Sequence, residues 1–204
     1  MSEAIRYGYY LRPSAAMCAA QSQIHTLLER QFGLRVAGRF MPHCTIKGFF
    51  KSEVSETRVR EIASTITDGV APFEVHNNGI VGWGTLASTI SIMFNPDGSR
   101  NESLQHLHQR AIDALLPIVA PDCNFTGGEW YGDRFHAHLT LAMADIPAAR
   151  AGEILEFCQE LEPIGPPSFT AEWLHLYAFE STDWRGEWWR DFRWTLCDSW
   201  RLTG

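Results

Sequence analysis

Two short segments of the chain carry side chains that could act together on one reacting group. Each segment reads His-x-Thr followed by an aliphatic residue, at positions 43–46 and 138–141. Both lie in apolar runs that predict buried strands, in which alternate side chains point to the same face. The histidine and the threonine of each segment should therefore lie side by side. The residue between them, Cys44 or Leu139, should point into the opposite layer.

Two imidazoles that face one cleft, each beside a hydroxyl, suit phosphoryl transfer without a metal. Histidine titrates near neutrality, so one imidazole can be neutral while the other is protonated, which predicts a bell-shaped pH profile near neutrality. His43 and His138 could supply the base for the attacking oxygen and the acid for the leaving oxygen. The hydroxyls of Thr45 and Thr140 could donate to the non-bridging oxygens. Lys47 is either an edge lysine that reaches solvent or an extra cation beside the phosphate.

The surroundings of the two segments predict one structural unit used twice. A strand and a helix precede each segment, a helix follows it, and a proline stands 29 residues after each histidine, at Pro72 and Pro167. Ser14 should cap the first helix, and Gly33 should end it. Hydrophobic periodicity predicts helices over 15–32, 53–67, 102–119 and 147–161. It predicts extended runs over 6–11, 43–50, 73–82, 88–94, 135–143, 168–179 and 191–202.

The composition is that of a soluble globular protein and limits the partners it can take. Of the 204 residues, 45% are hydrophobic and 20% are charged. No apolar run approaches the ~20 residues of a membrane span. The five cysteines have no metal-binding spacing and the N-terminus has no export signal, which predicts a cytoplasmic protein with free thiols. The net charge of −7 argues against binding along a long nucleic acid. We expect a monomer that takes a small nucleotide or an RNA terminus.

Residues 121–134 form the least regular stretch of the chain and lead directly into the second His-x-Thr segment. A loop of this length in a compact domain is often functional, so it could lie over the site. Its aromatic residues Trp130 and Tyr131 either stack on a base of the substrate or anchor the loop. Both are therefore candidates for substrate binding.

The remaining histidines raise the alternative of a metal site. His136 shares a strand face with His138, and with His43 opposite, three imidazoles could hold zinc. A metal protein would normally supply more carboxylate or histidine ligands, so we expect no metal and no cofactor. His136 is then a cleft-wall or structural residue. On the predicted helices, we expect a structural or surface position for His25 and surface positions for His106 and His108.

The paired motifs, the repeated layout and the run from His43 to Lys47 resemble the two-histidine (2H) phosphoesterase superfamily. The most similar branch is that of the 2'-5' RNA ligase-like and cyclic phosphodiesterase proteins. The resemblance covers nearly the whole chain. It implies an α/β (α+β) fold with two lobes, in which two antiparallel sheets surround a central cleft and the helices lie outside. Residues 1–204 would form one domain of two pseudo-repeats, roughly 1–82, with its last strands exchanged, and 83–204.

The same resemblance implies an activity and roles for the motif residues. Members of the superfamily open 2',3'-cyclic or related cyclic phosphates, or cleave 2'-5' or 3'-terminal phosphodiester bonds, without a metal. By this resemblance His43 protonates the leaving oxygen, His138 activates water, and the two threonines bind phosphate. Ala137 stands where the family usually has proline, and no arginine follows the second motif, so the substrate stays open. The alternatives are a weakly catalytic module that binds a nucleotide or an RNA end, and a 2'-5' RNA ligase-like activity.

Overall fold

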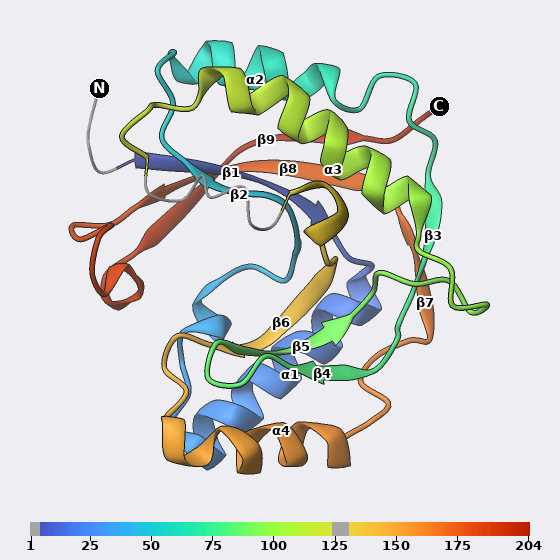
Figure 1. Ribbon diagram of the computed structural model, residues 1–204, viewed down its shortest axis with the longest axis vertical. Helices are drawn as coiled ribbons and strands as arrows, with labels where there is room; N and C mark the ends of the chain where they lie inside the picture. Colours follow the sequence, from blue (N-terminus) through green and yellow to red (C-terminus); the bar gives the residue numbers. More distant parts are fainter. Residues whose placement is uncertain (1–4, 124–130) are drawn as a thin grey trace.

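The structure of the chain is a computed structural model, and it describes residues 5–123 and 131–204. Four α-helices and nine strands occur within these residues (Figure 1). The helices are α1 (Ala15–Phe32), α2 (Glu56–Thr65), α3 (Glu102–Leu115) and α4 (Ala151–Glu160). The strands are β1 (Ile5–Arg12), β2 (Cys44–Phe50), β3 (Phe73–His76), β4 (Ile80–Gly82), β5 (Ala87–Ser91), β6 (His138–Met143), β7 (Ser168–Ala171), β8 (Trp173–Glu180) and β9 (Arg193–Arg201).

The strands form two antiparallel sheets of unequal size. Seven of them lie in the order β4-β5-β6-β2-β1-β8-β9, and β3 pairs separately with β7. In the middle of the large sheet, β2 and β6 pair at one position only, Cys44 opposite Leu139. The expected pair of sheets is thus present as β4-β5-β6 and β2-β1-β8-β9, but these are joined into one sheet through that single residue pair.

The order strand, helix, strand, helix, strand, strand occurs twice along the described chain, from β1 to β4 and from β5 to β8. The last strand of each half pairs with the first strand of the other half, because β4 pairs with β5 and β8 pairs with β1. The division of the chain into two pseudo-repeats with exchanged last strands, and its two-lobed duplication, stay predictions.

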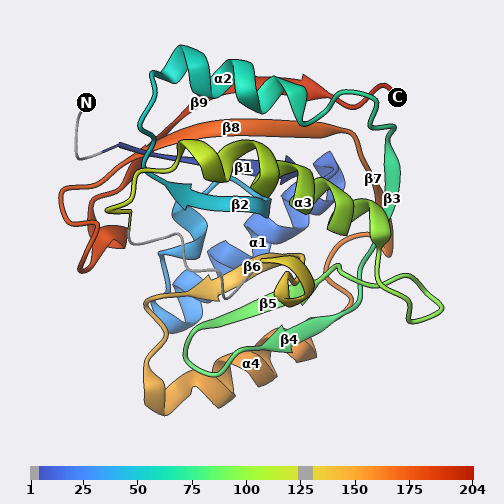
Figure 2. The same cartoon turned by 45° about the horizontal axis from the view of Figure 1, so that its top comes forward.

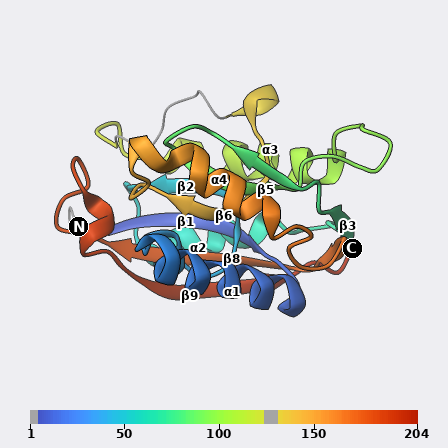
Figure 3. The ribbon, with the colours of Figure 1, turned by 90° about the horizontal axis from the view of Figure 1, so that it is seen from below.

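The helices cover the two parts of the large sheet from opposite sides. Helices α2 and α3 contact each other and strands β9 and β2, and the turned view shows α3 alongside β2 (Figure 2). Helices α1 and α4 contact β6, β5 and β4, and both are seen from below in Figure 3. These two helices also touch directly, through the rings of Phe32 and Phe157, whose centroids are 5.1 Å apart.

The predicted and observed ends of the helices agree best where a capping residue defines the end. Helix α1 has the predicted bounds, because the Ser14 hydroxyl accepts a hydrogen bond from the Met17 N–H and Gly33 ends the helix in the left-handed conformation. Helix α2 begins at Glu56 rather than residue 53, since the Ser55 side chain caps it at that point. The helix predicted over 102–119 ends at Leu115 and continues as a 3₁₀ turn, Leu116–Ile118.

Two of the predicted extended runs are divided between the two sheets. The run 73–82 breaks into β3 and β4 at Gly79, which has a φ of 81° that side-chain-bearing residues rarely adopt. The run 168–179 divides at Glu172 into β7, which pairs with β3, and β8, which pairs with β1. Alternating hydrophobicity identifies extended chain but does not show which partner each part will pair with.

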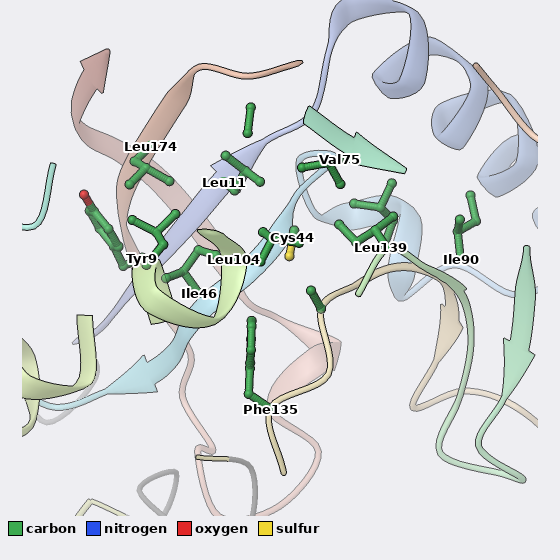
Figure 4. Close-up of a cluster of buried hydrophobic side chains, with 14 of the residues drawn as sticks. Tyr9, Leu11, Cys44, Ile46, Val75, Ile90, Leu104, Phe135, Leu139 and Leu174 are labelled. Atoms are coloured by element: carbon green, nitrogen blue, oxygen red, sulfur yellow. The ribbon is translucent and has the colours of Figure 1, made fainter. Parts of the chain in front are cut away.

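The main hydrophobic core contains the middle residue of each His-x-Thr segment. Cys44 and Leu139 are fully buried there, together with Tyr9, Ile46 and Ile90 (Figure 4). This confirms that the middle residue of each His-x-Thr segment points away from the face that carries the histidine and the threonine. Within the described residues, none of the five cysteines is in a disulfide bond.

Candidate active site

The two His-x-Thr segments meet where β2 and β6 pair. Because Cys44 lies opposite Leu139 in antiparallel strands, His43 faces Thr140 across the pair, and Thr45 faces His138. All four side chains therefore project from the same face of the sheet. The structure therefore brings together the four residues that the sequence predicts to be functional. An approximate local two-fold axis relates the two His-x-Thr segments.

The two imidazoles are held by equivalent hydrogen bonds. His43 Nδ1 lies 2.7 Å from the carbonyl oxygen of Met41, and His138 Nδ1 lies 2.7 Å from that of His136. A carbonyl only accepts hydrogen bonds, so Nδ1 must carry the hydrogen in both rings. In the neutral state each Nε2 then has a free lone pair. Each histidine is thus oriented by the carbonyl two residues earlier, with Nε2 available for proton transfer.

Burial lowers the pKa of both imidazoles. His43 packs edge-on against Tyr10, with ring centroids 4.7 Å apart, and also contacts Phe40. Loss of solvation lowers the pKa of His43 to about 4, and the neighbouring His138 adds to this effect. Desolvation also lowers the pKa of His138, which is partly opposed by its hydrogen bond to His136. Without substrate, both rings are therefore neutral at pH 7.

The two threonine hydroxyls are available to a ligand. In the part of the chain that the structure describes, neither the Thr45 nor the Thr140 hydroxyl makes a hydrogen bond. The backbone of Thr140 is fixed, because its carbonyl oxygen accepts from Gln21 Nε2 at 2.8 Å and from His25 Nε2 at 2.9 Å. His25 is therefore a structural residue, which is one of the two positions predicted for it. The hydrogen bond from Gln21 was not predicted from the sequence.

If the two hydroxyls bind the phosphate of a substrate, replacement of either threonine by valine should lower kcat by about 10- to 100-fold, because one hydrogen bond to a charged oxygen is then removed while the side-chain shape is kept. The Thr45→Ser and Thr140→Ser variants keep the hydroxyl and should retain most of the activity. Thr195→Val, on the exposed part of β9, is the matched control. Equal rates for the valine variants and the wild type would show that the hydroxyls do not contact the phosphate.

A cavity of about 400 Å³ opens beside the residue pair, where β2 and β6 separate. Of the predicted site residues, Thr45, Lys47, Tyr131 and His138 line it. His43 and Thr140 are not part of its wall. The other predicted residue of the irregular loop, Trp130, lies outside the described residues.

Lys47 is not the edge lysine at the surface that was one of its two predicted positions, and a position beside the phosphate stays a prediction. Thr45 pairs with Tyr10 whereas Lys47 pairs with Tyr9, because the register between β1 and β2 is irregular here, so Lys47 does not continue the face of His43 and Thr45. Its side chain does not reach solvent either, with 1% of the residue exposed. The ammonium lies 5.4 and 5.6 Å from the ring centroids of Phe50 and Tyr131. Burial lowers the pKa of Lys47 to about 8.

The cavity also contains residues that the sequence analysis missed. His108, predicted at the surface, is 2% exposed, and its Nδ1 donates to the Ile46 carbonyl at 2.8 Å. The sequence does carry a signal for this burial, because His108 lies four residues after Leu104 and three before Ala111, on the apolar stripe of α3. His106 is exposed, as predicted.

His136 lies in the wall of the cavity. Its Nε2 lies 3.1 Å from the Ser91 hydroxyl, and its ring packs edge-on against Trp83. Among residues 5–123 and 131–204, no three metal-binding side chains come together. The arrangement therefore gives no support to the three-histidine alternative.

The class of protein follows from these features and from comparison with known families. The family model described as the 2'-5' RNA ligase superfamily matches residues 13–183. The chain belongs to this superfamily, which confirms the resemblance to the 2H phosphoesterases. A search of curated proteins gave no match.

Solved structures show the same fold. The crystal structure of E. coli LigT complexed with phosphate has 20% identity and a TM-score of 0.52 over 100% of both chains. LigT complexed with 3'-AMP has 20% identity and a TM-score of 0.54, over 99% of this chain and 100% of that one. The Thermus thermophilus protein TT0787 has 16% identity and a TM-score of 0.62 over 98% of both chains. In the described residues, no helix has the length and apolar character needed to span a membrane.

Proposed function

We propose that this chain is a phosphodiesterase that hydrolyses a cyclic phosphate, either of a 2',3'-cyclic nucleotide, of an RNA end or of a related cyclic nucleotide. The observation that carries the proposal is the meeting of the two His-x-Thr segments at one residue pair, with both Nδ1 atoms held by carbonyls. Two oriented imidazoles supply a base and an acid, so the chemistry needs no metal. Membership of a superfamily of phosphoesterases supports this reading.

The proposed reaction is an in-line attack of water on phosphorus. The free Nε2 of one histidine takes a proton from the water as the new P–O bond forms. The Nε2–H of the other histidine protonates the ribose oxygen as the ring P–O bond breaks, which leaves a phosphomonoester. Thr45 and Thr140 donate hydrogen bonds to the non-bridging oxygens, where negative charge develops. The two histidines then return to their starting states by exchanging protons with solvent.

The proposed substrate is small. A net charge of −7, from 17 basic and 24 acidic residues, does not favour contacts along a long phosphate backbone. Lys47 and Tyr131 line the cavity next to Thr45 and His138, so we also propose that they contact the substrate. LigT, which shares the fold, has been crystallised with 3'-AMP, ATP and NADP+. A nucleotide or an RNA terminus is therefore the proposed partner.

Hydrolysis of the four 2',3'-cyclic mononucleotides and of an RNA oligonucleotide with a 2',3'-cyclic end tests the function. We expect turnover to a 2'- or 3'-monoester by protein that has been exhaustively treated with a chelator. Phosphorus NMR of the products identifies which ring bond breaks. If activity disappeared with the chelator and returned with zinc, the proposed acid–base mechanism would be wrong. If all substrates bound but none was hydrolysed, the chain would be a binding module.

A further inference from the structure

A buried positive charge, that of Lys47, lies in the wall of the cavity. In the described ranges, no carboxylate lies within ion-pair distance of Lys47. Its Nζ donates to the Gly48 carbonyl at 3.1 Å, and the Phe50 and Tyr131 rings lie near it. An ammonium has three hydrogens, and burying it without full compensation is costly. Lys47 therefore has donor capacity left for a ligand.

Two further buried polar atoms in the same wall have no hydrogen-bond partner among the residues that the structure describes. They are His108 Nε2 and the Tyr131 hydroxyl. Because His108 Nδ1–H donates to the Ile46 carbonyl, Nε2 of the neutral ring is an acceptor. The two rings are neighbours, with centroids 6.1 Å apart. Loss of solvation lowers the pKa of His108, and the nearby charge of Lys47 adds to this effect. Unsatisfied buried polar groups are uncommon in proteins, so three groups with spare capacity on one wall indicate that a ligand pairs with them.

The remaining walls suit a flat aromatic ligand. Phe135 stacks on His108 with ring centroids 4.0 Å apart and an interplanar angle of 2°. Trp83 lines the cavity as well, and its indole N–H is already bonded to the Thr89 hydroxyl, so it offers its ring surface. A volume of about 400 Å³ lies in the usual range of small-molecule sites. A second phosphate would fit poorly here, since its oxygens would face the lone pair of His108 Nε2.

On the basis of the proposed function, we propose that this cavity binds the nucleobase of the substrate and selects a base with a carbonyl oxygen beside a ring N–H, as in guanine and uracil. Lys47 Nζ donates to the carbonyl oxygen, and His108 Nε2 accepts the ring N–H. The Tyr131 hydroxyl pairs with the next group on the base edge. Adenine and cytosine carry the opposite pattern of donors and acceptors. Their amino group would face the Lys47 ammonium, and their unprotonated ring nitrogen would face the lone pair of His108 Nε2.

The test compares kcat/KM for the 2',3'-cyclic phosphates of guanosine, uridine, adenosine and cytidine. We expect the guanosine and uridine substrates to be favoured by about tenfold or more, since the wrong base leaves buried polar groups unpaired. Equal values for the four substrates would overturn the inference while leaving the proposed function intact.

Variants of His108 test whether the preference for guanine and uracil arises in this cavity. In His108→Asn, the side-chain amide can still donate to the Ile46 carbonyl, but the acceptor at the Nε2 position is lost. We expect the preference to fall to within about threefold of unity, because the ring N–H of the favoured base then has no partner. His106→Asn, on the exposed face of α3, should keep the wild-type preference. An unchanged preference in His108→Asn contradicts the proposed contact. Lys47→Met provides a second variant, and it should weaken the preference in the same direction.

Direct binding separates this inference from the proposed reaction. Calorimetry with the 3'-monophosphates of guanosine and adenosine measures the base preference without any turnover. Tighter binding of the guanosine compound, lost in His108→Asn, supports the inference even if no cyclic phosphate is hydrolysed. Equal affinities refute it whatever the activity. Loss of turnover on all four substrates, with the binding preference retained, refutes only the proposed function.

Discussion

Replacement of His43 or His138 by alanine is expected to lower kcat by about 10²–10⁴-fold on every cyclic phosphate that the chain hydrolyses. Each substitution removes one of the two proton transfers in the proposed reaction. The loss should be seen in kcat as well as in kcat/KM, because the proton moves in the transition state rather than on binding. The double variant should be only a little slower than the slower single variant, since the two groups act in one step.

The buried position of His43 calls for a variant that keeps the local structure. His43→Asn can preserve the hydrogen bond to the Met41 carbonyl while removing Nε2. It should be as inactive as His43→Ala but unfold closer to the wild-type temperature, and the same comparison applies to His138→Asn and the His136 carbonyl. His106→Ala, which is exposed on α3, is the control for activity. A near-wild-type rate for either asparagine variant would remove that histidine from the mechanism.

The same variants decide which histidine is the acid. An ester with a good leaving group, such as a nitrophenyl phosphodiester, needs no proton on the leaving oxygen. The variant that lacks the acid should therefore regain much of its rate on this substrate, whereas the variant that lacks the base should not. The deep burial of His43 favours its neutral form, which suits a base. The family resemblance implies the opposite order, with His43 as the acid.

The arrangement of the four motif side chains could be predicted from the sequence because it depends on local patterns. Residues two apart on a strand share a face whatever the strand pairs with, so the positions of Thr45 and Thr140 beside their histidines followed from the spacing alone. Capping residues are equally local, and α1 accordingly has the predicted ends. Neither inference required knowledge of the tertiary structure.

The features that depend on distant pairing could not be predicted in this way. Nothing in the chain near Cys44 specifies that β2 and β6 will pair only at Cys44 and Leu139, and the cavity lies beside this pair. The burial of Lys47 likewise results from an irregular register with β1 and from the approach of Tyr131. The polarity of histidine favours a surface position for His108, although its helical spacing places it on the buried stripe. Its partner, the Ile46 carbonyl, lies 62 residues away in sequence.

The pH dependence of kcat/KM should have its maximum clearly below about pH 6.5, which is where two histidines of unperturbed pKa would place it. This parameter reports the free enzyme, in which burial lowers the pKa of His43 to about 4 and that of His138 below its usual value of about 6.5. Catalysis needs one neutral and one protonated imidazole. The active form therefore exists between the two lowered pKa values, and kcat/KM should fall about tenfold per pH unit above that window.

The pH dependence of kcat should differ from that of kcat/KM in a defined direction. In the complex, the anionic phosphate lies against both rings and favours the imidazolium form, so both pKa values rise and the bell moves to higher pH. Parallel measurement of the two parameters from pH 4 to 9, on a substrate whose phosphate does not titrate in this range, tests the effect. Removal of one imidazole in His43→Asn should eliminate one limb of the bell, whereas Thr195→Val should leave the profile unchanged. A kcat/KM maximum above pH 7 would show that burial does not lower the pKa values of the two imidazoles in the free enzyme.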